Sequence, residues 1–94
     1  MWELAKQTLT SRLLVGSAGY PSLHCMQEAI RAAKTNVITV SIKREAPQGT
    51  GGEDFWAAIK QLNCHILPNT AGCKTAESAI KMAEIARELF STNW

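Results

Sequence analysis

The sequence has few of the features that mark specialised classes of protein. Its three cysteines, Cys25, Cys64 and Cys73, are odd in number and widely spaced, so they form neither a disulfide framework nor a zinc-binding pattern. Aromatic residues make up 6% of the chain, too few for a ladder that stacks nucleic-acid bases. The longest early apolar run, residues 13–15, is far short of the roughly 20 residues that a membrane span needs.

The charge and the hydrophobic content are those of an ordinary globular chain. The net charge is +2 and the ten basic residues are dispersed, which argues against nucleic acid as a partner. The 94 residues, 46% of them hydrophobic, allow at most one small domain, residues 1–94. We expect no signal peptide, because no apolar run follows Met1, and unpaired thiols suit a reducing compartment. We therefore expect a cytoplasmic protein without membrane, metal or cofactor.

Strand patterns recur along the chain. Residues 3–10 predict a short β-hairpin, and the continuous apolar run within 12–17 predicts a strand covered on both faces. The β-branched segment 37–42 predicts a second strand, closed by Lys43-Arg44, whose two faces the sequence does not assign. A third strand is expected at 64–67 and should stop at Pro68, which cannot donate a ladder hydrogen bond.

Helices are predicted between these strands. One begins near Pro21 with Ser22 as its N-cap, and we expect Asn36 to leave it in a left-handed conformation. After a loop over 45–52, a second helix opens at Glu53-Asp54 and ends at Asn63.

A third helix is capped by Thr75. Glu77 and Lys81 on its polar side have the spacing of an i,i+4 ion pair. Its apolar face is expected to be wide and to comprise Ala76, Ala79, Ile80, Ala83, Ala86 and Phe90.

The three main strands begin near residues 12, 37 and 64, so their spacings are 25 and 27 residues. This rhythm predicts an α/β fold of parallel βα repeats joined by right-handed crossovers. A sheet of three such units has two open edges. A folded chain is therefore expected to pair them with another copy of itself or with a complementing chain.

One segment resembles a known family. Leu-Pro-Asn-Thr-Ala-Gly at 67–72, followed by Lys-Thr-Ala-Glu at 74–77, is similar to the thiazole synthase of thiamine biosynthesis. The resemblance covers essentially the whole chain, as the N-terminal part of a longer protein. Weaker matches in the same order are Ser11-Arg12-Leu13 with Gly16, Glu28-Ala29-Ile30 and Lys43-Arg44.

The resemblance implies a (β/α)₈ barrel of the TIM type, which needs about 250 residues, so this chain would supply the first three units. The family condenses deoxyxylulose phosphate with a glycine-derived imine and sulfur from a carrier protein that bears a C-terminal thiocarboxylate. The sugar is held as a Schiff base on a lysine of the fourth strand, which would begin at Trp94. The lysine would lie just beyond, so no catalytic residue is assigned here and the chain alone is expected to be inactive.

Four residues are candidates for substrate binding. Asn69 and Thr70 follow the third strand and are expected to line the substrate mouth; the alternative is that they only order the loop. Lys43 and Arg44 are expected to bind the sugar phosphate or the carboxylate tail of the sulfur carrier; the alternative is an exposed basic pair.

Three further residues that follow Thr70 are not expected to bind substrate or to act in catalysis. Gly72 is expected to allow either a positive φ or close packing of the loop. Lys74 lacks the burial that activates a Schiff-base lysine, and Cys73 is interpreted as an incidental small residue.

Two other functions remain open from the sequence. One is another phosphate-sugar barrel of the Schiff-base aldolase type. The other is a stand-alone, non-catalytic α/β module that self-associates or binds a partner.

Overall fold

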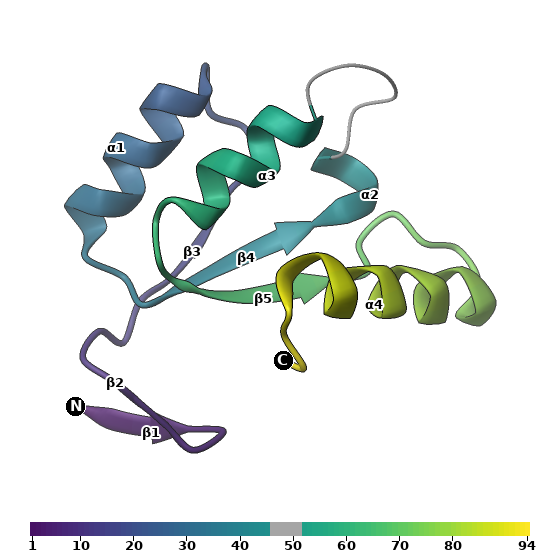
Figure 1. The fold of residues 1–94 in the computed structure, drawn as a ribbon, viewed down its shortest axis with the longest axis horizontal. Coiled ribbons are helices and arrows are strands. Elements are labelled where there is room, and N and C mark those ends of the chain that lie inside the picture. The colour runs from purple at the N-terminus through teal and green to yellow at the C-terminus, as the bar shows by residue number, and fades with distance from the viewer. Residues whose placement is uncertain (46–51) are drawn as a thin grey trace.

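The chain forms a small hairpin and a parallel sheet carrying helices (Figure 1). The computed structural model describes residues 1–45 and 52–94. The strands are β1 (Trp2–Leu4), β2 (Gln7–Leu9), β3 (Leu14–Gly16), β4 (Val37–Ser41) and β5 (His65–Asn69). The helices are α1 (Leu23–Ala33), α2 (Ile42–Glu45), α3 (Gly52–Lys60) and α4 (Ala76–Phe90).

The strand order confirms the expected hairpin and the parallel α/β arrangement. β1 and β2 pair antiparallel, and β3, β4 and β5 form one parallel sheet with β4 in the centre. Each crossover between parallel strands contains at least one helix, as parallel connections require. Three parallel strands are compatible with part of a barrel.

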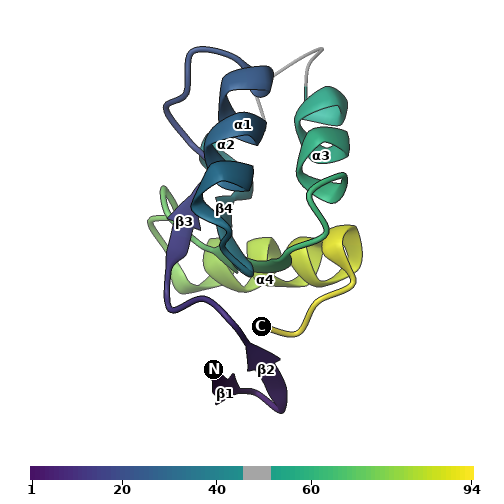
Figure 2. The same ribbon diagram turned by 90° about the vertical axis from the view of Figure 1, so that its left-hand side faces the viewer.

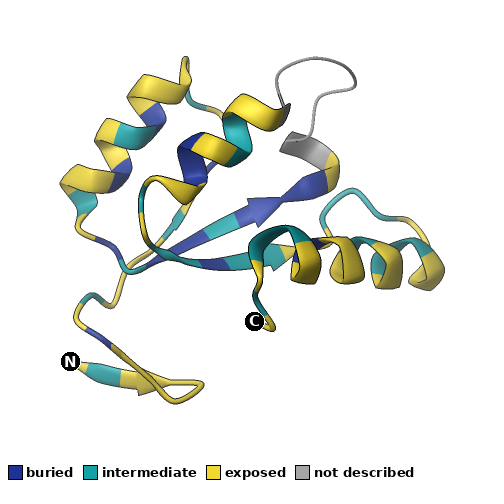
Figure 3. Ribbon diagram, in the orientation of Figure 1, coloured by how far each residue is buried: buried dark blue, intermediate teal, exposed yellow. Residues whose placement is uncertain are grey.

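The core lies between the sheet and α1 and α3, which run side by side over one face (Figure 2). Ile38 and Val40 of β4 point into it and are 0% exposed. Figure 3 shows the buried residues concentrated on β4 and on the sides of α1 and α3 that face it. The other members of the core are Met26, Ile30, Ala58, Ile59 and Ile66.

Both predicted N-caps are confirmed. The Ser22 hydroxyl accepts from the Cys25 N–H at 3.1 Å, and the Thr75 hydroxyl accepts from the Ser78 N–H at 3.1 Å. The expected left-handed exit at Asn36 is wrong, because Lys34 takes that conformation with φ 53°. The first helix thus ends two residues earlier than predicted.

The prediction that Pro68 stops the third strand is also wrong, since β5 continues through it to Asn69. The His65 N–H donates to the Asn36 carbonyl at 2.8 Å, so it lies on the edge of β5 that faces β4. Along a strand successive N–H groups alternate in direction, so the nitrogen of Pro68 lies on the opposite edge from β4. No hydrogen bond to β4 is lost there, and an edge position tolerates proline.

The expectation that Lys43-Arg44 closes the second strand is wrong as well. β4 ends at Ser41, opposite Asn69, and the next residues form the one-turn helix α2. Beyond Ser41 neither neighbouring strand continues, so a helical turn satisfies the backbone groups instead. Residues 46–51 of the expected loop lie outside the described residues, and its first and last residues belong to α2 and α3.

The second and third long helices match their predictions in part. α3 ends at Lys60, and Asn63 follows with a positive φ of 54°. In α4 the Glu77–Lys81 ion pair is confirmed at 3.5 Å. The expected apolar face is only half covered, because Ala86 is 2% exposed but Ile80 is 59% exposed. No helix within residues 1–45 and 52–94 is long and apolar enough to cross a membrane.

The Asn36 side chain holds the hairpin against the sheet. Its Oδ1 accepts from the Thr10 N–H at 2.9 Å, from the Thr10 hydroxyl at 3.0 Å and from the Ser11 N–H at 2.8 Å. The Trp2 indole N–H donates to the Ser11 carbonyl at 2.8 Å. Since the Asn36 carbonyl also accepts from β5, this residue joins the hairpin to the amino ends of two parallel strands.

Replacing this side chain should release the hairpin. Asn36→Ala leaves two backbone donors without their acceptor, and we expect the free energy of unfolding to fall by about 1–2 kcal/mol. Urea unfolding measures the loss, and faster amide exchange at Leu9 localises it. Asn36→Asp keeps an acceptor oxygen and should stay near the parent. Equal stability of Asn36→Ala and the parent would show that the contact holds nothing in place.

Candidate functional site

A polar cleft opens at the carboxyl ends of the three parallel strands. Its volume is about 240 Å³. In parallel α/β proteins this end of the sheet is where ligands bind. The lining residues come from β3 and the residues after it, from β4, and from β5 and its following loop: Gly16, Ser17, Ala18, Thr39, Ser41, Asn69 and Ala71.

Two buried hydroxyl groups hold the three strand ends together. The Ser17 hydroxyl donates to the Thr39 carbonyl at 2.8 Å, which joins the end of β3 to β4. The Ser41 hydroxyl donates to the Ala71 carbonyl at 3.2 Å, which joins the end of β4 to the loop after β5. Ser17 and Ser41 are 3% and 6% exposed. Their hydrogen bonds therefore join the ends of adjacent strands around the cleft.

Sequence reasoning did not single out these serines as site residues. A signal was present, because Val37, Thr39 and Ser41 alternate with the apolar residues that face the helices. It could not be used without knowing which face of the sheet the helices cover. The sequence contains the alternation, but not the side on which α1 and α3 pack.

The loop after β5 is ordered by its own side chains. The Asn69 Oδ1 accepts from the Ala71 N–H at 3.0 Å, a turn that asparagine commonly forms. Gly72 has φ 89°, as predicted, a conformation that costs a residue with a Cβ. Asn69 therefore orders the loop, as one of its two interpretations predicted, and the same residue also lines the cleft.

The four candidates for substrate binding are not all brought to the cleft. Asn69 lines it, whereas Thr70 lines a neighbouring cavity on the other side of β5. Lys43 is exposed on α2 and is absent from the lining. Arg44 is placed on α2 by its backbone, and its side chain lies outside the described structure.

The remaining candidates show no sign of catalysis. Lys74 is exposed, so its surroundings offer no desolvation of the ammonium group. Cys73 is half-buried just before the N-cap of α4. In the described part of the chain no group of three or more His, Cys, Asp or Glu side chains is arranged to hold a metal ion.

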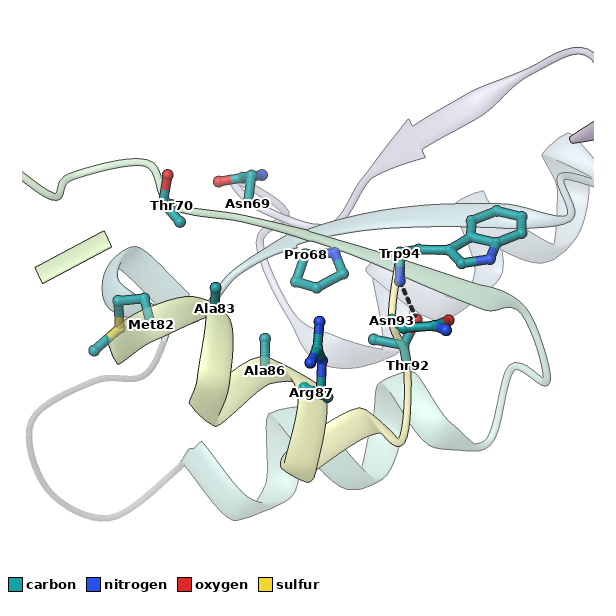
Figure 4. Close-up of a pocket in the computed structure, with 10 residues that line it drawn as sticks. All are labelled: Pro68, Asn69, Thr70, Met82, Ala83, Ala86, Arg87, Thr92, Asn93 and Trp94. Atoms are coloured by element: carbon teal, nitrogen blue, oxygen red, sulfur yellow. Dashed lines mark hydrogen bonds between the residues drawn. The ribbon is translucent and has the colours of Figure 1, made fainter. Parts of the chain in front are cut away.

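The neighbouring cavity lies between β5, α4 and the last residues of the chain (Figure 4). Its volume is about 90 Å³. At its rim the Trp94 ring stacks on the His65 ring, with centroids 4.9 Å apart and planes 12° apart. Its lining is Pro68, Asn69, Thr70, Met82, Ala83, Ala86, Arg87, Thr92, Asn93 and Trp94.

The sequence profile of the family described as "Thiazole biosynthesis protein ThiG" matches residues 3–94, nearly the whole chain. The chain belongs to this family. The resemblance carried by residues 67–77 is thereby confirmed, and the family of a thiamine biosynthesis enzyme is established. Membership of this family favours a relationship to thiazole synthase over one to a phosphate-sugar barrel of the aldolase type.

Individual members of the family agree closely with the chain. A thiazole synthase of Bradyrhizobium sp. (strain BTAi1) is 52% identical over 88 residues, which is 94% of this chain and 34% of that protein. A thiazole synthase of Brucella anthropi is 47% identical over 94 residues, which is 100% of this chain and 37% of that protein. The chain thus spans about a third of the length of these relatives.

Cys64 should react slowly with thiol reagents. Burial raises the pKa of this thiol, and its Sγ donates to the Thr35 carbonyl at 3.4 Å. The attacking species is the thiolate, so at pH 8 we expect the exposed Cys25 to be alkylated first. Mass spectrometry of peptides after timed iodoacetamide treatment measures the order. Equal rates at the two cysteines would contradict the environment described for Cys64.

The same group should make stability fall at high pH. The pKa of Cys64 in the folded chain is above its ordinary value of 9.0, so above that pH the unfolded chain releases this proton more readily. The stabilisation is complete below pH 9.0 and is lost as the pH rises through the raised pKa. Urea unfolding at a series of pH values measures the loss. Cys64→Ala should show a smaller decline than the parent, and an identical decline would refute this contribution.

Proposed function

We propose that residues 1–94 are the N-terminal partial barrel of a thiazole synthase and that the cleft forms part of its substrate mouth. The observation that supports this most is the polar cleft at the carboxyl ends of three parallel strands, with the family segment 67–77 at its rim. Active sites of TIM barrels are built from the loops at this end.

The whole enzyme would form thiazole phosphate from deoxyxylulose phosphate, a glycine-derived imine and the thiocarboxylate of a sulfur carrier protein. A lysine beyond Trp94 would hold the sugar as a Schiff base, so the 94 residues alone would be inactive. We place this enzyme in the cytoplasm and assign it no cofactor.

The part of Asn69 would be to orient the sugar. Its Oδ1 is engaged by the Ala71 N–H at 3.0 Å, which fixes the side chain at the cleft. The amide NH₂ is then the group that donates to a hydroxyl or carbonyl oxygen of the substrate. Because the loop is already ordered, little conformational entropy is lost when the substrate binds.

Thr70, Lys43 and Arg44 would act around this contact. Thr70 lines the neighbouring cavity and not the cleft, so its hydroxyl would act from the other side of β5. Lys43 and Arg44 lie on α2, which begins where β4 ends, at the same end of the sheet as the cleft. Positive charge there favours the anionic sugar phosphate or the carboxylate tail of the carrier.

A chimaera tests the role of Asn69. Residues 1–94 are joined to the segment of the Brucella anthropi thiazole synthase that follows its matched region, and thiazole phosphate formation is measured. Loss of one hydrogen bond to the sugar should raise KM for deoxyxylulose phosphate about tenfold in Asn69→Ala. Asn69→Asp keeps the acceptor for Ala71 but loses the NH₂ donor, so it should be impaired as well.

The two variants separate binding from loop order. If Asn69 only orders the loop, Asn69→Asp will retain the KM of the parent while Asn69→Ala will not. If both variants retain it, Asn69 does not contact the sugar.

Borohydride trapping tests where the chemistry lies. The chimaera should gain the mass of the reduced sugar phosphate on a lysine beyond Trp94, and residues 1–94 alone should gain none. Labelling of Lys43 or Lys74 in the 94-residue chain would contradict this division.

A further inference from the structure

The loop after β5 depends on hydrogen bonds more than on packing for its position. Asn69 and Thr70 are exposed, and the three residues that follow are only half-buried. The Cys73 N–H donates to the Thr70 carbonyl at 3.1 Å, so residues 70–73 form a tight turn. Gly72 has the positive φ that the third position of such a turn accepts. These contacts lie within the loop, so they do not fix its orientation relative to the sheet.

The ladder of the sheet ends where this loop begins. The last register pair between β4 and β5 is Ser41 opposite Asn69. Within residues 1–45 and 52–94, no strand continues beside the loop beyond this pair. Ser41 is 6% exposed, and its hydroxyl donates to the Ala71 carbonyl at 3.2 Å. A side chain of β4 thus holds the loop at the place where backbone pairing has stopped.

Ala71 links this contact to Asn69. Its N–H donates to the Asn69 Oδ1 at 3.0 Å, and its carbonyl accepts from Ser41. The Asn69 side chain points to the other side of β5 from Pro68 (Figure 4), as neighbours along a strand do. It lines the cleft together with Ser41 and Ala71. The direction of the Asn69 amide therefore depends on Ala71, which Ser41 ties to β4.

We infer that Ser41 is a positioning residue for substrate binding, which holds the loop so that the Asn69 amide NH₂ is directed at the sugar. Ser17, the other buried serine of the cleft, is not placed for this role. Its hydroxyl donates to the Thr39 carbonyl, where ladder pairing already aligns β3 with β4. The inference rests on the sugar contact proposed for Asn69, and it adds a residue that acts through Asn69.

Kinetics of the chimaera described above test this role. Ser41→Ala removes the hydroxyl and leaves the Cβ in place. We expect KM for deoxyxylulose phosphate to rise about threefold to tenfold, which corresponds to one neutral hydrogen bond. The kcat should be unchanged, because the positioned group binds the ground state and the transition state alike. Amide exchange at Ala71, measured without substrate, should become about threefold faster, because the loop opens more readily.

A double variant shows whether Ser41 acts through Asn69. In Asn69→Ala the group that Ser41 positions is gone, so adding Ser41→Ala should raise KM no further. If the two changes multiply their effects on KM, the inference is wrong, because Ser41 then acts separately from Asn69. Unchanged Ala71 exchange in Ser41→Ala would also overturn it.

Thr35→Val is the matched control, because it removes a buried hydroxyl at the opposite, amino end of β4. This hydroxyl donates to the Leu13 carbonyl and lies far from the loop in the order of the strand. The change should lower stability and leave KM at the value of the parent. A rise in KM equal to that of Ser41→Ala would show general loosening of the sheet and contradict the positioning role.

The single variants separate this inference from the proposed function. If Asn69→Ala raises KM and Ser41→Ala does not, the sugar contact stands and the role of Ser41 fails. If Asn69→Ala leaves KM unchanged, the sugar contact fails, and the role of Ser41 fails with it.

Discussion

The central strand β4 is the element on which the other parts of the structure depend. It is paired on both edges, its residues Ile38 and Val40 are fully buried under α1 and α3, and Val37 on the other face is 1% exposed. A strand covered on both faces requires apolar or small side chains throughout, and this one has them. Backbone hydrogen bonds to β4 align both β3 and β5. The carboxyl ends of the three strands, which form the cleft, therefore lie together because of β4.

The two ends of this sheet are held by different polar contacts. At the amino end, Asn36 bonds to the hairpin through its side chain and to β5 through its carbonyl. At the carboxyl end, Ser17 and Ser41 bridge neighbouring segments. A parallel sheet has slanted, evenly spaced ladder bonds and no tight turns between its strands. Side chains near its ends therefore connect adjacent strands, as hairpin turns do in antiparallel sheets.

Much of the site follows from local rules. The caps at Ser22 and Thr75 and the positive φ of Gly72 depend on the chemistry of single residues, so they were predictable. The strand boundaries that were predicted wrongly depend on the neighbouring strands. Pro68 remains in a strand because its nitrogen is on the open edge, and Ile42 leaves the strand because neither neighbour continues. Neither reason is present in the local sequence.

What the sequence determined by itself was the alternation of strands and helices, the family and the segment 67–77 that carries its signature. These depend on periodicity and residue identity, which local chemistry sets. Only the tertiary structure decided which face of β4 is on the side of the cleft. It also decided that Ser17 and Ser41 join the strand ends there, and that half of the apolar face of α4 is uncovered. Those outcomes depend on which elements are available to pack against one another. Within residues 1–45 and 52–94, β5 has a neighbouring strand on one edge alone, the edge that pairs with β4.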